Sequence, residues 1–161
     1  MIKKIYDKCV SWAGSKHAKP LLAFESFIES SFFPIPPDVM IIPMVVAKKK
    51  EFVRIALIAT IFSVLGALFG YMIGYIFFNE IGIKIFEVYG YEDPNFLKAK
   101  FSTKGGFISW LGILVTAGFT PLPFKLLTIS SGFIHFNIIF FIIICIVTRG
   151  SRFFLVAFLT Y

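Results

Sequence analysis

Residues 29–38 read ESSFFPIPPD, and the prolines in this stretch interrupt an apolar segment that extends from residue 20 to residue 47. Proline has no backbone N–H and disfavours helix in the residue before it, so the segment divides into two short helices. Each helix is shorter than the roughly 20 residues that cross a bilayer. Lysine clusters at both ends of the segment favour the same side of a membrane. We therefore expect residues 20–47 to form a re-entrant hairpin, with Pro34, Pro36 and Pro37 at its tip.

The second half of the chain contains a matching break. Residues 107–133 are mostly apolar, and Pro121 and Pro123 interrupt them as the earlier prolines interrupt the first segment. The glycine pair Gly105-Gly106 is expected to stop the helix that precedes this segment. Because one continuous apolar segment lies between the two breaks, the second hairpin should enter from the opposite side of the membrane.

Two uninterrupted apolar segments, 52–78 and 136–161, are long enough to cross a bilayer. The chain is 58% hydrophobic with a mean hydropathy of +0.86, which is more apolar surface than a soluble domain of this size can bury. We expect an all-α integral membrane protein, a single membrane domain over 1–161, with two re-entrant helical hairpins and two transmembrane helices as an inverted repeat. The alternative is a plain bundle of proline-kinked spans. The last segment ends at Tyr161 without the polar tail expected after a span, which leaves open whether the chain is complete.

The remaining segments are polar and predict the orientation. Residues 1–19 place apolar and basic side chains at helical spacing, as an amphipathic interfacial helix does, and carry a net charge of +4. Residues 48–54 carry +3, whereas residues 79–104, which we expect to form interfacial helices, carry no net charge. Basic flanks face the cytoplasm, so we expect a cytoplasmic amino terminus, most simply at a bacterial inner membrane. The total charge of +7 then indicates contact with anionic lipid and not with nucleic acid.

Gly66, Gly70 and Gly74 lie four residues apart within the first span. Glycines at this spacing form a flat stripe that allows another helix to approach closely. We interpret the stripe as a packing surface. The sequence leaves open whether the chain also forms a homo-oligomer.

Six ionisable residues lie inside the predicted membrane segments, where such groups are costly and usually functional. Three acidic residues come from the first hairpin and three basic residues from the second half of the chain: Glu25, Glu29, Asp38, Lys125, Arg149 and Arg152. An interior site where the two sets meet would neutralise itself, which makes burial of the charges tolerable. Broken segments in matching positions predict that this site lies near the two proline breaks.

Simpler roles remain open for several of these residues. Glu25 could lie near the headgroups, and Asp38 could only cap the helix that follows it. Arg149 and Arg152 could extend their side chains to the cytoplasmic surface. His135, between the second hairpin and the last span, is interpreted as an interfacial residue and not as a ligand.

Signatures of enzymes and cofactor sites are absent from the sequence. It contains no glycine-rich phosphate loop, no nucleophile elbow and no histidine or cysteine cluster with metal-binding spacing. Cys9 and Cys145 are far apart and match no redox motif. We therefore expect no metal, no cofactor and no enzymatic activity.

In residues 29–38 a glutamate is followed after four residues by Pro-x-Pro and then by an acidic residue. This motif resembles that of the DedA family, also called SNARE-associated Golgi or VTT-domain proteins. The glycine stripe and the second proline hairpin are similar to family segments in the same order, so the resemblance covers most of residues 20–133. Pro37 replaces the usual glycine of the motif. Of two family arginines around the second proline break, the one expected near Gly118 is missing, and Lys125 lies close to the other.

Residues 148–154 instead resemble the YqaA-type branch of the family. This leaves open whether Arg149 and Arg152 replace the usual arginine pair. Membership would imply a flippase- or scramblase-like translocase that moves polyprenyl phosphate or phospholipid across the membrane. The resemblance also implies dependence on the proton-motive force.

This hypothesis assigns two roles to the intramembrane charges. The cations bind a phosphate headgroup; these are Lys125, Arg149 and Arg152. The carboxylates carry the proton or exchange partners with the cations; these are Glu29, Asp38 and Glu25. The alternatives are a membrane enzyme acting on lipid phosphates and a scaffold that only packs with partners. The sequence does not specify the cargo, the direction of transport or the energy coupling.

Overall fold

The computed structural model describes residues 11–31, 37–77, 79–80, 99, 102–119 and 124–161. All regular structure in these ranges is helical, which confirms the predicted all-α class. The elements in chain order are α2 (Ala18–Ser31), α3 (Asp38–Ala47), the short 3-10 helix η1 (Lys49–Glu51), α4 (Phe52–Phe77), α7 (Lys104–Phe119), α8 (Phe124–Phe133) and α9 (Ile138–Thr160).

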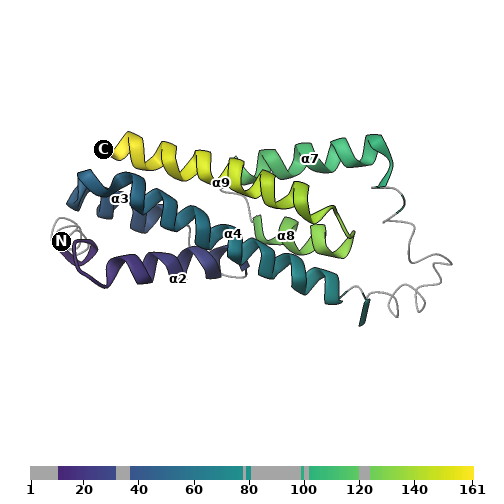
Figure 1. Cartoon of the computed structure of the whole chain (residues 1–161), viewed down its shortest axis with the longest axis horizontal. Coiled ribbons are helices and arrows are strands. Elements are labelled where there is room, and N and C mark those ends of the chain that lie inside the picture. Colours follow the sequence, from purple (N-terminus) through teal and green to yellow (C-terminus); the bar gives the residue numbers. More distant parts are fainter. Residues whose placement is uncertain (1–10, 32–36, 78, 81–98, 100–101, 120–123) are drawn as a thin grey trace, which may run out of the picture.

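Figure 1 shows α4 and α9 side by side along the length of the molecule, running in opposite directions. The helices α2 and α3 accompany one half of this pair, and α7 and α8 accompany the other half. In each half the first short helix packs on the long helix of its own half, α2 on α4 and α7 on α9. The second short helix packs on the long helix of the other half, α3 on α9 and α8 on α4. Each long helix therefore contacts short helices from both halves of the chain.

Among the described residues, two helical segments are long and apolar enough to cross a membrane, Lys49–Phe77 and Ile138–Thr160. The start of α4, the first described residues and the carboxyl terminus lie at the same end of the molecule (Figure 1). An ion pair between Lys19 and Glu51, with 2.5 Å between Nζ and Oε2, joins the two basic flanks at this end. The two flanks that the sequence assigns to one side of a membrane therefore lie together.

The starts of α2 and α7 differ from the sequence-based expectation. The helix α2 begins at Ala18 and includes Pro20 in its first turn, where the missing N–H of proline breaks no helical bond. The helix α7 begins at Lys104, so the expected stop at Gly105-Gly106 is wrong. The hydroxyl of Thr103 accepts a hydrogen bond from the backbone N–H of Gly106 at 3.2 Å, and this cap starts a helix where the glycines alone indicated an end.

The glycine stripe of α4 faces two short helices, one from each half. A methyl group added at Gly66 would lie well under 3.0 Å from the carbonyl oxygen of Phe27 in α2. One added at Gly74 would meet the carbonyl oxygen of Ile129 in α8 at a similarly impossible distance. The backbones of the three helices are thus in direct contact, which only glycine permits.

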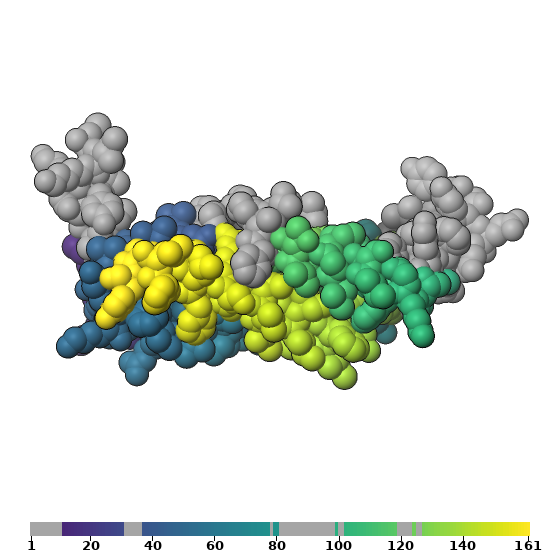
Figure 2. Space-filling model, turned by 90° about the horizontal axis from the view of Figure 1, so that it is seen from above, coloured from purple at the N-terminus to yellow at the C-terminus, as the bar shows by residue number. Residues whose placement is uncertain are grey.

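Two apolar cores fill the two ends of the molecule. One core lies around α7, α8 and the first half of α9, and it includes Leu114, Phe124, Phe141 and Tyr71. The other core lies around α2, α3 and the second half of α9, and it includes Leu22, Ile41, Ile55 and Phe153. Seen from above, the carboxyl-terminal turns of α9 and the helix α7 occupy opposite ends of one face (Figure 2). Between the cores, near the middle of both long helices, lies a layer of polar side chains.

Candidate functional site

Arg149 is the centre of this polar layer. Its side chain is 1% exposed, and it is the largest of the fully buried side chains in the described part of the chain. Nη2 forms an ion pair with Oε2 of Glu29 and donates to the hydroxyl of Ser30 at 2.9 Å. Nε donates to the hydroxyl of Ser63 at 2.8 Å. The guanidinium therefore joins α9 to both α2 and α4.

The surroundings of Arg149 supply hydrogen-bond partners for its guanidinium and exclude water from it. The hydroxyls of Ser30 and Ser63 lie 2.6 Å apart and hydrogen bond to each other. The ring centroids of Phe124 and Phe153 lie 4.9 and 5.3 Å from the guanidinium carbon, within cation–π range. Such desolvation strengthens the attraction between the cation and Glu29, and it makes loss of either partner costly.

A second ion pair lies one helical turn further along α9. Arg152 Nη2 contacts Oδ2 of Asp38, with both side chains mostly but not fully buried. Residues three apart on a helix share a face, so both arginines point toward the first hairpin. Glu29 lies near the end of α2 and Asp38 is the first residue of α3, so each arm of that hairpin is bound to α9 beside its tip.

Three polar atoms near the ion pairs are buried without a hydrogen-bond partner in the described part of the structure: Glu25 Oε2, Ser26 Oγ and Asp38 Oδ1. Buried polar groups are normally paired, so each such atom needs a physical explanation.

The structure decides between several of the roles left open by the sequence. Asp38 does not cap α3: the N-cap residue is Pro37, no side-chain cap bond is formed, and the carboxylate binds Arg152 instead. Arg149 does not extend to a surface, because it is almost completely buried. Glu25, one turn before Glu29 in α2, is half-buried and remains apart from both arginine pairs.

Some predicted site residues lie outside the described residues. These are the proline positions Pro34, Pro36, Pro121 and Pro123, whereas Pro37 is described and buried. Lys125 belongs to the first turn of α8, directly after Phe124, but its side chain is also outside the described part. The structure therefore brings together four of the six predicted charges: Glu29, Asp38, Arg149 and Arg152.

Sequence reasoning missed the serines that complete the site. Ser63 precedes Gly66 by three residues and Gly70 by seven, so it lies on the glycine face of α4 that contacts α2. Ser30 directly follows Glu29. A polar residue on the packing face of an apolar helix is the signal that could have identified Ser63.

Comparisons with known proteins give two relatives and no activity. No protein-family model matches the chain, and no solved structure is significantly similar to it. A protein of Haemophilus influenzae is 39% identical over 158 residues, which cover 95% of this chain and 77% of that protein. A protein of Histophilus somni is 37% identical over 152 residues, which cover 94% of this chain and 77% of that protein. Both are described only as uncharacterized proteins. The chain belongs to the family of these two proteins.

Proposed function

We propose that the protein is a membrane translocase for a lipid with a phosphate headgroup, either a polyprenyl phosphate or a phospholipid. The observation that carries the proposal is the pair of buried arginines on α9, each held by a carboxylate from one arm of the first hairpin. Membrane placement, headgroup exchange and proton uptake are its three parts.

The outward surfaces of the long helices support placement in a membrane. Large apolar side chains are exposed along both, for example Leu57, Ile61 and Leu65 on α4 and Ile143, Ile146 and Val147 on α9. Contiguous apolar surface of this extent is unusual on a monomer in water and suits contact with hydrocarbon. In this placement α4 and α9 cross the bilayer, the short helices form two re-entrant hairpins, and the lysine-rich end faces the cytoplasm.

The same placement sets the ion pairs near the bilayer midplane. Ser63 and Arg149 lie near the middle of α4 and α9, respectively. Charges at this depth are costly, and in transporters they mark the path of the substrate.

A phosphate headgroup can replace a carboxylate on each arginine. Guanidinium binds phosphate and carboxylate with the same forked geometry. Arg149 would keep its bond to Ser63 while phosphate oxygens take the places of Glu29 and Ser30. Because Arg152 lies on the same face one turn away, one headgroup could contact both guanidinium groups.

The displaced carboxylates would then take up protons. An ionised carboxylate without its arginine is too costly to keep at this depth, whereas a protonated one is neutral. Among the described residues, one buried carboxylate oxygen of Asp38 and one of Glu25 have no hydrogen-bond partner. Entry of one phosphate anion would thereby be linked to entry of one or two protons, which is how a proton gradient could drive transport.

A reconstituted transport assay tests the proposal. Vesicles containing the protein and a fluorescent polyprenyl phosphate or phosphatidylglycerol would report movement between leaflets, with and without a pH gradient. Glu29→Gln should abolish transport and leave a folded, inserted protein, because Gln keeps the shape but cannot ionise or carry a proton.

Glu51→Gln is the matched control, since Glu51 is a paired but partly exposed carboxylate at the lysine-rich end. We expect it to transport normally. Wild-type transport by Glu29→Gln would show that the Glu29–Arg149 pair only holds the helices together, and absence of transport in the wild-type protein with every anionic lipid would overturn the proposal.

A further inference from the structure

The turn between α8 and α9 has an unusual residue at its key position. His135 has a φ of 55°, in the left-handed region, and is the sole non-glycine residue with positive φ in the described part of the chain. The backbone N–H of His135 donates to Gly132 at 3.0 Å, and that of Phe136 donates to Ser131 at 2.9 Å. These two bonds define a Schellman motif, in which the left-handed position is normally glycine.

A side chain at this position costs conformational energy that glycine would avoid. The imidazole of His135 hydrogen bonds through Nδ1 to the carbonyl oxygen of Phe133, 3.2 Å away, and its ring lies against the ring of Tyr75, with 4.3 Å between the centroids. The backbone bonds of the motif require no side chain at this position, so the strain at His135 points to a role for its ring.

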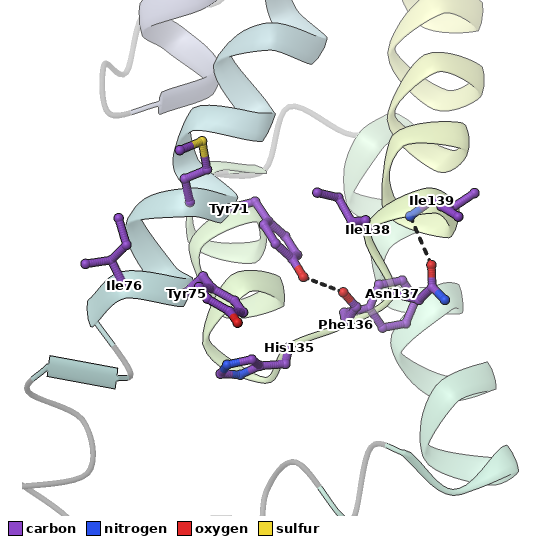
Figure 3. A pocket seen from close by; sticks show the side chains of 9 residues that line it. Tyr71, Tyr75, Ile76, His135, Phe136, Asn137, Ile138 and Ile139 are labelled. Atoms are coloured by element: carbon purple, nitrogen blue, oxygen red, sulfur yellow. Dashed lines mark hydrogen bonds between the residues drawn. The ribbon is translucent and has the colours of Figure 1, made fainter.

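Beside this histidine lies a cavity of about 550 Å³ between the last turns of α4 and the start of α9. Figure 3 shows the side chains of α4 facing those of the α8–α9 turn, with His135 below Tyr75 at one edge. The lining is mostly apolar, with polar groups at the turn, and includes Met72, Tyr75, Ile76, His135, Ile138 and Ile139. Size and lining are those of a small-molecule site that receives an apolar ligand and orients it by a few polar contacts.

The apolar walls of the cavity continue onto the exposed surfaces of the long helices. Met72, Ile76, Ile138 and Ile139 are all substantially exposed. If these surfaces face hydrocarbon, the cavity opens sideways into the bilayer while His135 lies at the level of the headgroups. The hydroxyl of Tyr75 and an imidazole N–H are hydrogen-bond donors, and a phosphate offers acceptors at that level.

We propose that this cavity binds one phospholipid of the outer leaflet, with a hydrocarbon chain between α4 and α9 and the phosphate against His135 and Tyr75. The site is separate from the arginine pairs. It rests on the membrane placement proposed above but not on transport, because it can be occupied by a protein that moves no lipid.

Photo-crosslinking in phosphatidylcholine nanodiscs tests the site. The probe is phosphatidic acid with a diazirine in its acyl chain, and the matched probe is the diacylglycerol with the same chain. We expect phosphatidic acid to label peptides that contain Met72 or Ile138, and the diacylglycerol to label them weakly. Loss of one charge-assisted hydrogen bond corresponds to about a tenfold change in affinity, so His135→Gly should reduce phosphatidic acid labelling about tenfold at subsaturating probe.

His135→Gly should leave the thermal stability nearly unchanged, because relief of strain at the left-handed position offsets the lost contacts with Phe133 and Tyr75. His135→Asn is the second variant, because asparagine tolerates this backbone and keeps a neutral donor; it should keep part of the labelling. Unchanged labelling in both folded variants, or equal labelling by the diacylglycerol, would overturn the proposal. A clear fall in stability of His135→Gly would assign the histidine to the fold instead. A transport assay that fails while labelling succeeds would count against the proposed function alone.

Discussion

The two short-helix pairs hold corresponding places in the fold but are attached to it by different chemistry. The first pair, α2 and α3, is bound to α9 through two ion pairs beside its tip. The second pair, α7 and α8, makes no ion pair in the described part of the chain, and its charged contact there is the cation–π contact of Phe124 with Arg149. It is attached mainly through apolar packing and through the backbone contact of Gly132 with Tyr71.

This difference separates reversible from permanent attachment. An ion pair can be released when a proton neutralises the carboxylate or an anion occupies the cation. A contact between two helix backbones can be released only by moving the helices apart, which loses the packing of both. We infer that the ion-paired contacts of the first pair with α9 respond to protons and anions, whereas the backbone contacts of α4 with α2 and α8 form the fixed frame. Substitutions in each part of the molecule test this inference.

The largest effect is expected in the frame, at Gly74. Gly74→Leu would force a side chain into the backbone of Ile129 and separate α4 from α8. The loss should exceed about 5 kcal/mol, enough to unfold many proteins, so little folded protein should be recovered on detergent size-exclusion chromatography. Gly112→Leu is the control, because a side chain at Gly112 in α7 meets nothing within 4 Å. Equal yields of the two variants would show that α4 and α8 are not in backbone contact.

Removal of one buried charge should have the next largest effect. Arg149→Met leaves the buried Glu29 carboxyl without its cationic partner, which should lower the free energy of unfolding by about 3–5 kcal/mol. Adding Glu29→Met removes the unpaired carboxyl, and the Ser30–Ser63 hydrogen bond remains. We therefore expect the double variant to regain most of the stability in thermal unfolding but no transport. If the double variant is as unstable as Arg149→Met, the ion pair is not the reason that Arg149 stabilises the fold.

A smaller effect is expected at the second ion pair. Asp38→Asn keeps one acceptor for Arg152 but removes the charge, and both side chains are partly accessible. The stability loss should be about 1.5 kcal/mol, the lower limit for a hydrogen bond to a charged group. Transport should fall much more than stability does. A variant with normal transport would restrict the response to the Glu29–Arg149 pair.

Much of the fold follows from the sequence because apolar runs and prolines act locally. The long helix expected over 52–78 is observed as Phe52–Phe77, and the one expected over 136–161 as Ile138–Thr160. The later start of α9 has a local cause. The side chain of Asn137 accepts a hydrogen bond from the backbone N–H of Ile139 at 3.0 Å and caps the helix. The expectation at Gly105 was wrong for the same reason, because the Thr103 cap outweighed glycine composition.

The site was predictable in composition but not in its pairing. Charge count and depth indicated four residues that do meet, but not that Glu25 would stay apart from them. Which carboxylate binds which arginine depends on how α9 rotates against the first hairpin. The rotation is set by packing of many apolar side chains, such as Phe153 and Ala157 in the core around Ile41. No pattern within one segment encodes it. The left-handed position of His135 was equally hidden, because Gly132, three residues earlier, is the residue that sequence rules would connect with a helix end.

The smallest expected effect concerns an uncharged contact in the frame. The hydroxyl of Tyr71 in α4 donates to the carbonyl oxygen of Phe136 in the α8–α9 turn at 2.6 Å, and its ring lies 5.1 Å from that of Phe141. Tyr71→Phe keeps the ring packing and removes one neutral hydrogen bond, so the stability loss should be about 1 kcal/mol.

Because this contact belongs to the frame and carries no charge, the transport rate of Tyr71→Phe should stay within about twofold of the wild type, a difference of less than 1 kcal/mol. Thermal unfolding and the vesicle assay measure the two quantities on the same preparation. The division between frame and responsive part would be established by two results together. Tyr71→Phe would lose stability but keep transport, and Asp38→Asn would lose transport but keep most of its stability. If Tyr71→Phe instead loses transport as completely as Glu29→Gln, the α8–α9 turn must move during transport. The difference in chemistry between the two hairpins would then no longer mark which of them moves.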